Sequence, residues 1–498
     1  MEQARMVLGI RYELSLRRAS GYTDYTLVED VDTAFISMVT DGNYAGAEIS
    51  QSTVREYETT AAAHILGLVG PLYPEDLENP FYDDYPQNAT VGKSGVEAAF
   101  EEYLRGKNGR RVISTNSEGK ITGQYYATEP EPGSTVELTI DLELQQTVEA
   151  ILAEAVTAMN KDGLTDRGAA AVVELVDSGE LLALANYPTY DLSTYRQDYT
   201  ELSEDPAHPL YNRATSTPYA PGSTIKPLTV AALEEGIVSP TDKIYSPYTW
   251  RYPGDPNSYS NCAGGSHGWI NVSQAITKSC NYFFSEMGYQ LGMDNLREYL
   301  SAFGLGAHTG IETGDNTGTL PENRPGEDQA PWAGYGQANQ AYTPLQLANY
   351  ICTLVSGGVR REPHLLKAVK SYDNSQVLAV GNTEPVQTLE LHDATLEAVK
   401  KGMYGYTQPG GSVAAYFQNC VVTAGAKTGT SQLGGDQKDN GVFVCFAPYD
   451  DPEIVVSIVI EHAGSGAALA PSAVKILNAY FSADNASGSI TGENQLLP

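Results

Sequence analysis

Ser223 and Lys226 lie three residues apart, a spacing that places a hydroxyl and an amine one turn from each other on one face of a helix. A serine hydroxyl is a weak nucleophile until a neighbouring base takes its proton. An amine can act as that base once it is neutral. The pair therefore suits nucleophilic attack on a carbonyl group, with a covalent acyl intermediate on Ser223.

The residues around Ser223 favour the start of a helix. Pro221 and Gly222 precede it, and a helical pattern of apolar residues runs over 228–235. Pro227 is compatible with a first turn, where N–H groups need no intrahelical acceptor. A helix start would favour developing negative charge at the serine, although a serine there is, taken alone, more often an ordinary N-cap.

A second polar pair, Ser279 and Asn281, follows a helical pattern over residues 272–278. At a helix end, Ser279 could relay a proton between a lysine and a leaving amine. The amide of Asn281 offers both a donor and an acceptor to a peptide backbone. Taken alone, this pair would be an ordinary polar helix end.

The third group, Lys427, Thr428, Gly429 and Thr430, follows a run of small residues that suits a strand. Gly429 permits close approach of a ligand to the backbone, and the two threonines face one side because side chains alternate along a strand. Lys427 can hold a carboxylate as a point charge. The N–H of Thr430 and that of the serine nucleophile would form an oxyanion hole. The competing interpretation is an exposed edge strand protected by a lysine.

Lys226 can serve as a base only if its pKa falls far below the ordinary value of ~10.4. Burial lowers the pKa of an amine, and a nearby cation lowers it further. Lys427 is the candidate cation. The hypothesis therefore requires both lysines to share a cleft with Ser223; otherwise Lys226 is an ordinary surface lysine.

Two of these spacings also occur elsewhere in the chain. Ser117 and Lys120 repeat the first spacing, and Ser114 and Asn116 repeat the second. Both pairs lie in a polar, glycine-containing stretch without a helical pattern to fix their geometry, so we interpret them as coincidental. The three groups above instead occur in ordered contexts, at separations that one domain of about 300 residues can bring together.

Length and composition exclude several classes of function. The chain has 498 residues, of which 41% are hydrophobic, so two or three domains are expected. The formal net charge of -32 argues against nucleic-acid binding and indicates an acidic, soluble surface. No apolar run reaches the ~18 residues of a membrane span. The five cysteines show no zinc-ligand spacing, so no metal is expected, and free thiols are favoured over a Cys262–Cys280 bridge.

Three segments can be distinguished along the chain. Residues 1–135 are rich in turns and charges, and a Pro/Glu/Gly-rich stretch at 129–133 marks their end. Residues 136–482 carry all three groups, and residues 483–498 form a polar tail. We therefore predict an N-terminal domain, a catalytic domain and a flexible tail.

The catalytic segment combines strand-like and helical patterns. Strands are predicted over residues 136–140, 168–175, 181–185, 441–446 and 453–460. A helix capped by Asp141, helices through much of 223–355 and a last helix over about 472–481 complete the segment. This order indicates an α/β fold of the α+β type, with a central antiparallel sheet covered by helices.

The three groups, in this order, resemble the S-x-x-K, S-x-N and K-T-G motifs of penicillin-binding proteins. Within that family the chain is most similar to class B members, the monofunctional peptidoglycan D,D-transpeptidases, of the elongation type. The resemblance covers nearly the whole chain. It also rests on residues 92–97, 104–109, 167–173, 186–191, 219–223, 267–268, 336–337, 343–346 and 427–432.

The resemblance implies a role for each residue. Ser223 would attack the D-Ala-D-Ala bond of a stem peptide, Lys226 would be the base, and Ser279 would pass the proton on. The amine of a second stem peptide would then resolve the acyl-enzyme. The substrate-binding residues would be Asn281, Lys427, Thr428, Gly429 and Thr430.

The resemblance also implies partners and a location. β-Lactam antibiotics would mimic the donor peptide and stay attached to the serine. A membrane glycosyltransferase of the elongation machinery would be a partner. Residues 1–135 would form an elongated pedestal, and a helix upstream of this chain would anchor the protein at the extracytoplasmic face of the bacterial cell membrane. No metal, organic cofactor or nucleic acid is implied.

Three alternatives stay open at this point. A β-lactamase or β-lactam sensor shares the motifs, but a hydrolase needs a base for the deacylating water, and no such residue is identified. An inactive morphogenesis scaffold would not need to keep Ser223, Lys226 and Lys427. A D,D-carboxypeptidase differs only in using water as the acceptor.

Overall fold

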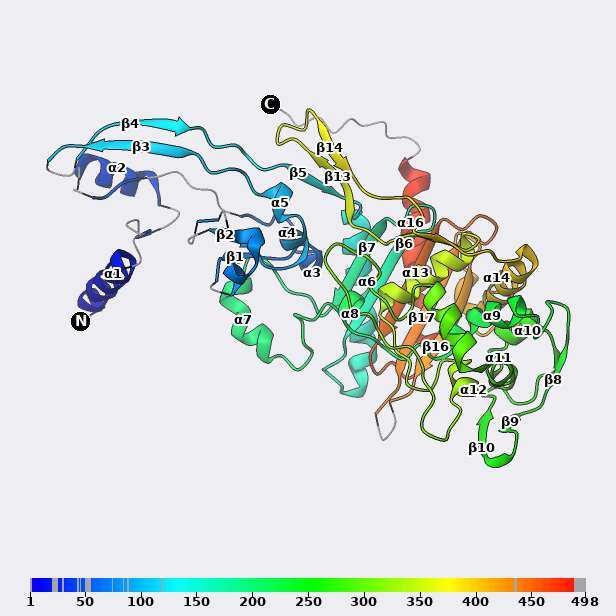
Figure 1. Ribbon diagram of the computed structural model, residues 1–498. Coiled ribbons are helices and arrows are strands. Elements are labelled where there is room, and N and C mark those ends of the chain that lie inside the picture. The colour runs from blue at the N-terminus through cyan, green and yellow to red at the C-terminus, as the bar shows by residue number, and fades with distance from the viewer. Residues whose placement is uncertain are drawn as a thin grey trace. The chain divides into compact units, whose positions relative to one another are not determined.

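The computed structural model describes residues 2–19, 26–28, 31–42, 44, 46–49, 55–73, 75–83, 85–86, 89–117, 120–433 and 437–487 (Figure 1). The chain divides into a smaller unit, residues 1–55 with 106–132, and a larger unit, residues 56–105 with 133–498. One boundary thus falls in the Pro/Glu/Gly-rich stretch. The assignment of separate domains to residues 1–135 and 136–482 stays a prediction.

Within its described residues, the smaller unit contains two helices and a two-stranded sheet. Helix α1 spans Glu2–Ala19 and helix α2 spans Thr33–Gly42. Strands β3 (Arg110–Thr115) and β4 (Ile121–Thr128) pair antiparallel. Among the helices in the described ranges, none combines the length and the low polarity that a membrane crossing requires.

The N-terminal part of the larger unit is built of short elements. Strand β1 (Val69–Pro71) pairs antiparallel with β2 (Thr90–Gly92). The short helices are α3 (Ala63–Leu66), η1 (Asp76–Glu78), η2 (Pro80–Tyr82), α4 (Gly95–Ala99) and α5 (Glu101–Leu104).

A five-stranded antiparallel sheet forms the centre of the larger unit, in the order β16-β17-β18-β6-β7. Alternate residues of β6 enter two different cores: Ala170 and Val172 belong to one, and Ala171 and Val173 to the other. Both faces are therefore covered, which confirms the predicted sheet. The strands are β6 (Ala169–Leu175), β7 (Leu181–Tyr187), β16 (Gly425–Ser431), β17 (Asn440–Ala447) and β18 (Ile454–Ile460).

Helices α6 (Leu142–Met159) and α16 (Ala470–Ser487) cover one face, and α13 (Pro344–Val355) packs on the other (Figure 1). The carboxylate of Asp141 accepts from the N–H of Leu144 at 3.0 Å, as predicted for the cap of α6. Helix α16 continues past the predicted end near residue 481, and the remainder of the predicted tail lies outside the described residues.

A group of helices adjoins the β16 edge of the sheet. The 3-10 helix η4 and helix α14 both pack on β16, α10 packs on α14, and α11 packs on η4. These elements deliver the candidate site residues. Their bounds are η4 (Gly222–Thr229), α9 (Val230–Glu234), α10 (Val272–Thr277), α11 (Asn281–Ala302), α12 (Ala330–Ala333) and α14 (Asp393–Thr407).

The region 223–355 is less helical than predicted. Four short strands interrupt it, with β8 pairing with β11 and β9 with β10. The strands are β8 (Ile244–Ser246), β9 (Thr249–Tyr252), β10 (Asp255–Asn261) and β11 (Gly268–Ile270). Three of these strands are only three or four residues long, and β10 is polar, so they show no clear alternation of apolar and polar residues.

The remaining elements complete the larger unit. A three-stranded sheet has the order β14-β13-β5, and β12 pairs with β15. The elements are β5 (Thr135–Leu138), β12 (Val359–Arg360), β13 (Leu366–Lys370), β14 (Val377–Val380), β15 (Gln387–Thr388), α7 (Tyr195–Glu204), α8 (Arg213–Ser216), α15 (Ala414–Phe417), η3 (Asn160–Asp162) and η5 (Gly466–Leu469).

Candidate active site

Ser223 lies in the first turn of η4, directly against strand β16. Gly222 has φ +52°, and a Cβ there would lie 2.5 Å from the carbonyl oxygen of Thr430. A Cβ on Gly429 would lie 2.3 Å from the carbonyl oxygen of Pro221. Only glycine permits this approach from both sides, and it brings the serine segment onto the K-T-G segment.

The predicted α-helix around Ser223 is a 3-10 helix over Gly222–Thr229, followed by the α-helical turn α9. Pro227 lacks an N–H group, which is one reason why regular α-helical bonding is not continuous here. A 3-10 helix has ~3 residues per turn, so side chains three residues apart are aligned. Ser223 and Lys226 therefore share a face, as their spacing predicted.

Lys226 is fully buried, and its side chain reaches from the first motif to the second. Its Nζ donates to the carbonyl oxygen of Ser279 at 2.8 Å and to Oδ1 of Asn281 at 2.7 Å, and lies 3.1 Å from Oγ of Ser279. The rings of Phe284 and Tyr335 lie 5.3 and 6.0 Å away. Burial, followed by the charge of Lys427, holds the pKa of Lys226 well below its ordinary value.

Ser279 lies in the turn that follows the end of helix α10. Its φ of +49° is unusual for a residue with a side chain and costs about 1–3 kcal/mol unless surrounding contacts hold it. Those contacts include its own N–H donating to Ile276 at 3.0 Å and the N–H of Cys280 donating to Ala275 at 3.0 Å. The turn presents both oxygens of Ser279 to Lys226.

Asn281 begins helix α11, and its amide orientation is fixed from both ends. Nδ2 donates to the carbonyl oxygen of Asn261 at 2.9 Å, so Oδ1 is the atom that accepts from Lys226. Ser279 and Asn281, which lie two residues apart in sequence, therefore contact the same atom, Nζ of Lys226. What Asn281 does toward a substrate stays a prediction.

Lys427 is fully buried on the edge strand β16. Its Nζ donates to the carbonyl oxygen of Thr428 at 2.9 Å and lies 4.3 Å from the ring centroid of Tyr406. Burial lowers the pKa of Lys427 to about 7. The predicted influence of this lysine on the pKa of Lys226 is confirmed, although burial is the larger cause.

The two repeated spacings belong to the smaller unit, whereas the three motifs belong to the larger one. Ser114 lies on strand β3. Residues 118 and 119, between Ser117 and Lys120, lie outside the described residues.

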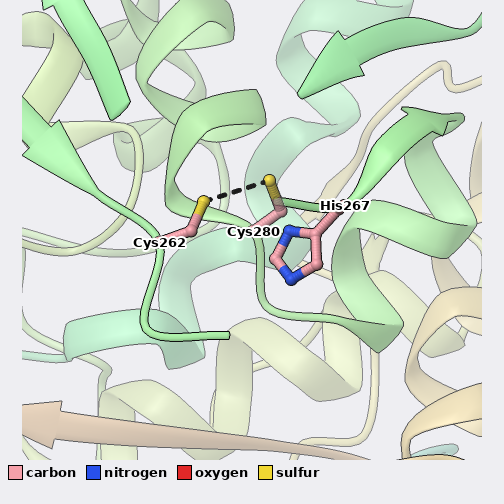
Figure 2. A group of neighbouring side chains, drawn as sticks. All are labelled: Cys262, His267 and Cys280. Atoms are coloured by element: carbon pink, nitrogen blue, oxygen red, sulfur yellow. Dashed lines mark hydrogen bonds between the residues drawn. The ribbon is translucent and has the colours of Figure 1, made fainter. Parts of the chain in front are cut away.

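Sequence reasoning missed a cluster beside the second motif, formed by Cys262, His267 and Cys280 (Figure 2). One donor atom from each residue lies within 4.8 Å of the others, so the cluster could hold a thiolate-binding ion such as zinc. The thiols are free, as favoured from the sequence, with their sulfur atoms 3.4 Å apart. The sequence predicts no metal here because these three residues do not have the close C-x-x-C spacing of common zinc sites.

Two observations describe the state of this cluster. A hydrogen bond from Cys280 is the main cause that lowers the pKa of the Cys262 thiol to about 6. Nδ1 of His267 is buried and has no hydrogen-bond partner among the described residues. Cys280 also stands between Ser279 and Asn281 in sequence, so the cluster adjoins the contacts of Lys226.

Comparison with known proteins agrees with the motifs. A model of the penicillin-binding protein transpeptidase domain matches residues 169–480, and one of the penicillin-binding protein dimerisation domain matches residues 3–138. The chain is 30% identical over 480 residues to peptidoglycan D,D-transpeptidase MrdA of Escherichia coli (strain K12), covering 89% of this chain and 73% of that protein.

Solved structures give the same result. PBP2 of Pseudomonas aeruginosa in complex with WCK 5153 superposes with a TM-score of 0.73 at 28% identity, covering 86% of this chain and 90% of that one. A second structure is a peptidoglycan synthase complex that coordinates polymerization and crosslinking. It superposes with a TM-score of 0.74 at 26% identity, covering 97% of this chain and 86% of that one.

Proposed function

Because the chain belongs to the penicillin-binding protein transpeptidase family, we propose that it cross-links peptidoglycan as a D,D-transpeptidase through an acyl-enzyme on Ser223. The observation that carries this proposal is the burial of Lys226 between Ser279 and Asn281, with a pKa held well below its ordinary value. A neutral amine one 3-10 turn from a serine hydroxyl is the base that acyl transfer requires.

The first half of the reaction forms the acyl-enzyme. Lys226 takes the proton of Ser223 as its Oγ attacks the carbonyl carbon of the D-Ala-D-Ala bond. The backbone N–H groups of Ser223 and Thr430 stabilise the oxyanion. When the C–N bond breaks, Ser279 passes the proton from Lys226 to the departing D-alanine amine.

The second half resolves the acyl-enzyme. The amine of another stem peptide attacks the ester carbonyl, and its proton returns to the Ser223 oxygen through Lys226. Water in place of the amine gives D,D-carboxypeptidase activity from the same intermediate. We propose that both acceptors are used, because the motif residues act on the acyl group and not on the acceptor.

Recognition of the donor rests on strand β16. We propose that Lys427, Thr428 and Thr430 hold the terminal carboxylate, with Gly429 leaving room beside the backbone. Asn281 would hold the peptide backbone of the donor. β-Lactams carry a carboxylate and a strained amide in a similar relation, so they would acylate the same serine.

The protein would work at the extracytoplasmic face of the bacterial cell membrane, where peptidoglycan is assembled. We propose a membrane glycosyltransferase of the elongation machinery as its partner. The support is the structural likeness to a peptidoglycan synthase complex that coordinates polymerization and crosslinking. That likeness covers 97% of this chain, which includes the smaller unit as well as the larger one.

Mass spectrometry after exposure to penicillin tests the proposal. We expect one penicilloyl adduct per chain, located on the peptide that contains Ser223, with slow release. Rapid turnover of the drug without a stable adduct would instead support a β-lactamase. Absence of any adduct from a folded chain would support an inactive scaffold.

A further inference from the structure

Helix α14 contacts both α10 and β16, the elements that lead into the second motif and carry the third. On the α10 side, Oγ of Ser273 donates to the carbonyl oxygen of Ala398 at 2.7 Å. Oγ1 of Thr277 donates to the carbonyl oxygen of Gly402 at 3.0 Å. These bonds fix the register of the two helices, because each ties a side chain of α10 to the backbone of α14.

The C-terminal end of α14 meets strand β16. Oγ1 of Thr407 donates to the carbonyl oxygen of Ala424 at 2.7 Å. One residue earlier, the hydroxyl of Tyr406 lies 2.5 Å from Oγ1 of Thr428, and its ring centroid lies 4.3 Å from Nζ of Lys427. Tyr406 is itself buried, so its ring has little freedom to leave this position.

We propose that Tyr406 is a positioning residue for the carboxylate end of the substrate. It orients the hydroxyl of Thr428 through a hydrogen bond and stabilises the ammonium group of Lys427 with the face of its ring. The inference rests on the proposed function, because it assigns a role within carboxylate recognition by β16. Tyr406 belongs to none of the three motifs and comes from a helix that the sequence did not connect with the site.

The hydroxyl contact leaves Thr428 able to bind a substrate. A threonine hydroxyl has one hydrogen and can accept two hydrogen bonds. When Tyr406 donates, the hydrogen of Thr428 is free for an incoming carboxylate oxygen. The donated bond also polarises the threonine hydroxyl and makes it a better donor.

The contact with the ring of Tyr406 lowers the free-energy cost of burying the ammonium group of Lys427. In the described part of the chain, no salt bridge to Lys427 is formed, and its Nζ donates to one carbonyl oxygen. A buried ammonium without a counter-ion is disfavoured. The negative face of an aromatic ring offsets part of this cost. The charge can therefore persist until the substrate carboxylate arrives.

Replacing Tyr406 with phenylalanine tests the hydroxyl contact alone, because the ring remains. The measurement is the second-order rate constant of acylation by benzylpenicillin and by its methyl ester, which lacks the carboxylate charge. We expect a fall of about fivefold for the acid, as for the loss of one hydrogen bond, and a smaller fall for the ester, whose carbonyl oxygen is a weaker acceptor than a carboxylate. Tyr406→Leu removes the ring as well, and we expect a further fall of about tenfold for the acid.

Tyr404→Phe is the matched control. Tyr404 lies two residues earlier on α14, and its ring stacks on Tyr449 at 4.1 Å. The substitution removes a hydroxyl from the same helix without changing a contact to β16. We expect both acylation rate constants and the melting temperature to stay at the wild-type values.

The ratio of the two rate constants decides the matter. If Tyr406→Phe slows the acid and the ester equally, Tyr406 only supports the fold and the inference is overturned. Unchanged rates for both ligands overturn it as well. If the wild-type chain forms no adduct at Ser223, the proposed function fails, and the inference fails with it.

Discussion

Lys226 has to be buried, neutral and hydrogen-bonded at the same time. A neutral amine has two hydrogens and one lone pair. The two hydrogens match the carbonyl oxygen of Ser279 and Oδ1 of Asn281, to which Nζ donates, and the lone pair is left to take a proton. The contacts therefore satisfy the neutral base, and no carboxylate is needed to hold it in place.

We expect Lys226→Met to lower the acylation rate constant for penicillin by at least about 100-fold, because a positioned general base contributes ~10²–10⁴. Methionine keeps an unbranched chain of similar length and removes the amine. Labelling kinetics with a fluorescent penicillin measure the effect. Lys401→Met, on the exposed side of α14, is the control and should react like the wild type. A near-normal rate in Lys226→Met would mean that another group is the base.

Because of Lys427, the rate constant of acylation should fall as the pH rises above neutral. Burial lowers the pKa of Lys427 to about 7, so the positive charge that holds the carboxylate is lost as the pH rises through that value. Lys226 faces Lys427 from η4, and Tyr406 faces it from α14. We expect the second-order rate constant for benzylpenicillin to fall above about pH 7, as measured by stopped-flow acylation.

The methyl ester of benzylpenicillin serves as the control for this pH profile. It lacks the carboxylate charge, so neutralising Lys427 should not slow its reaction. The rate with the ester should therefore not fall as the pH rises through about 7. A falling limb that is identical for acid and ester would contradict the assignment to carboxylate binding.

At the scale of elements, the site depends on the close approach of η4 to β16. The approach is possible because Gly222 and Gly429 face backbone atoms of the opposite element. A side chain at either position would occupy space already filled by a carbonyl group. The absence of a Cβ at Gly222 and Gly429 thus sets the distance between the segment that carries Ser223 and strand β16.

Gly429→Ala should separate the two elements. The added Cβ would lie 2.3 Å from the carbonyl oxygen of Pro221, so η4 or β16 must move. We expect acylation to fall by about 100-fold, which is the effect of a displacement near ~1 Å in a catalytic group. Gly123→Ala is the control, since a Cβ there meets no atom within 4 Å. Normal acylation by a folded Gly429→Ala variant would show that the contact does not set the geometry.

The motif residues could be predicted because their spacing is local. Lys226 lies one turn from Ser223, and Asn281 lies two residues from Ser279, so the sequence itself encodes their proximity. Tyr406 could not be found this way, because it is separated from Thr428 by 22 residues and reaches it only through the packing of α14. The sulfur atoms of Cys262 and Cys280 likewise meet across 18 residues.

The cluster of Cys262, His267 and Cys280 should bind zinc, since thiolate and imidazole are ligands that zinc prefers. We expect added zinc to raise the melting temperature by about 2–4 °C at saturating concentration. Differential scanning calorimetry and metal analysis measure the effect. Cys262→Ser should lose both the shift and the bound metal, whereas Cys420→Ser should keep them. Equal zinc binding by the two variants would place the metal elsewhere.

At the scale of the whole molecule, the predicted α+β architecture is confirmed by the antiparallel sheet with helices on both faces. The hairpin β6–β7 and strands β17 and β18 were predicted because they are long, apolar and bounded by turns. The strands between residues 244 and 270 were not, because β8, β9 and β11 are too short to show a period and β10 is polar. Strands were thus predictable where they are buried and apolar, and the intrinsic strand propensity of single residues contributed less.

The net charge also acts on the molecule as a whole. With 62 acidic and 30 basic residues, most carboxylates have no basic partner available, and their mutual repulsion opposes the compact state. Salt shortens the range of this repulsion from ~30 Å at 0.01 M to ~8 Å at 0.15 M. Stability should therefore increase with ionic strength, unlike that of a protein held by surface ion pairs.

We expect the melting temperature at pH 7.5 to rise by about 1 °C between 10 and 150 mM sodium chloride, as for a gain near ~1 kcal/mol in a chain of this size. Circular dichroism measures the transition. Choline chloride at equal ionic strength is the control, because screening depends on charge and not on the identity of the cation. A rise with sodium alone would indicate specific ion binding, and a fall with both salts would mean that attractive pairs outweigh the repulsion among the excess carboxylates.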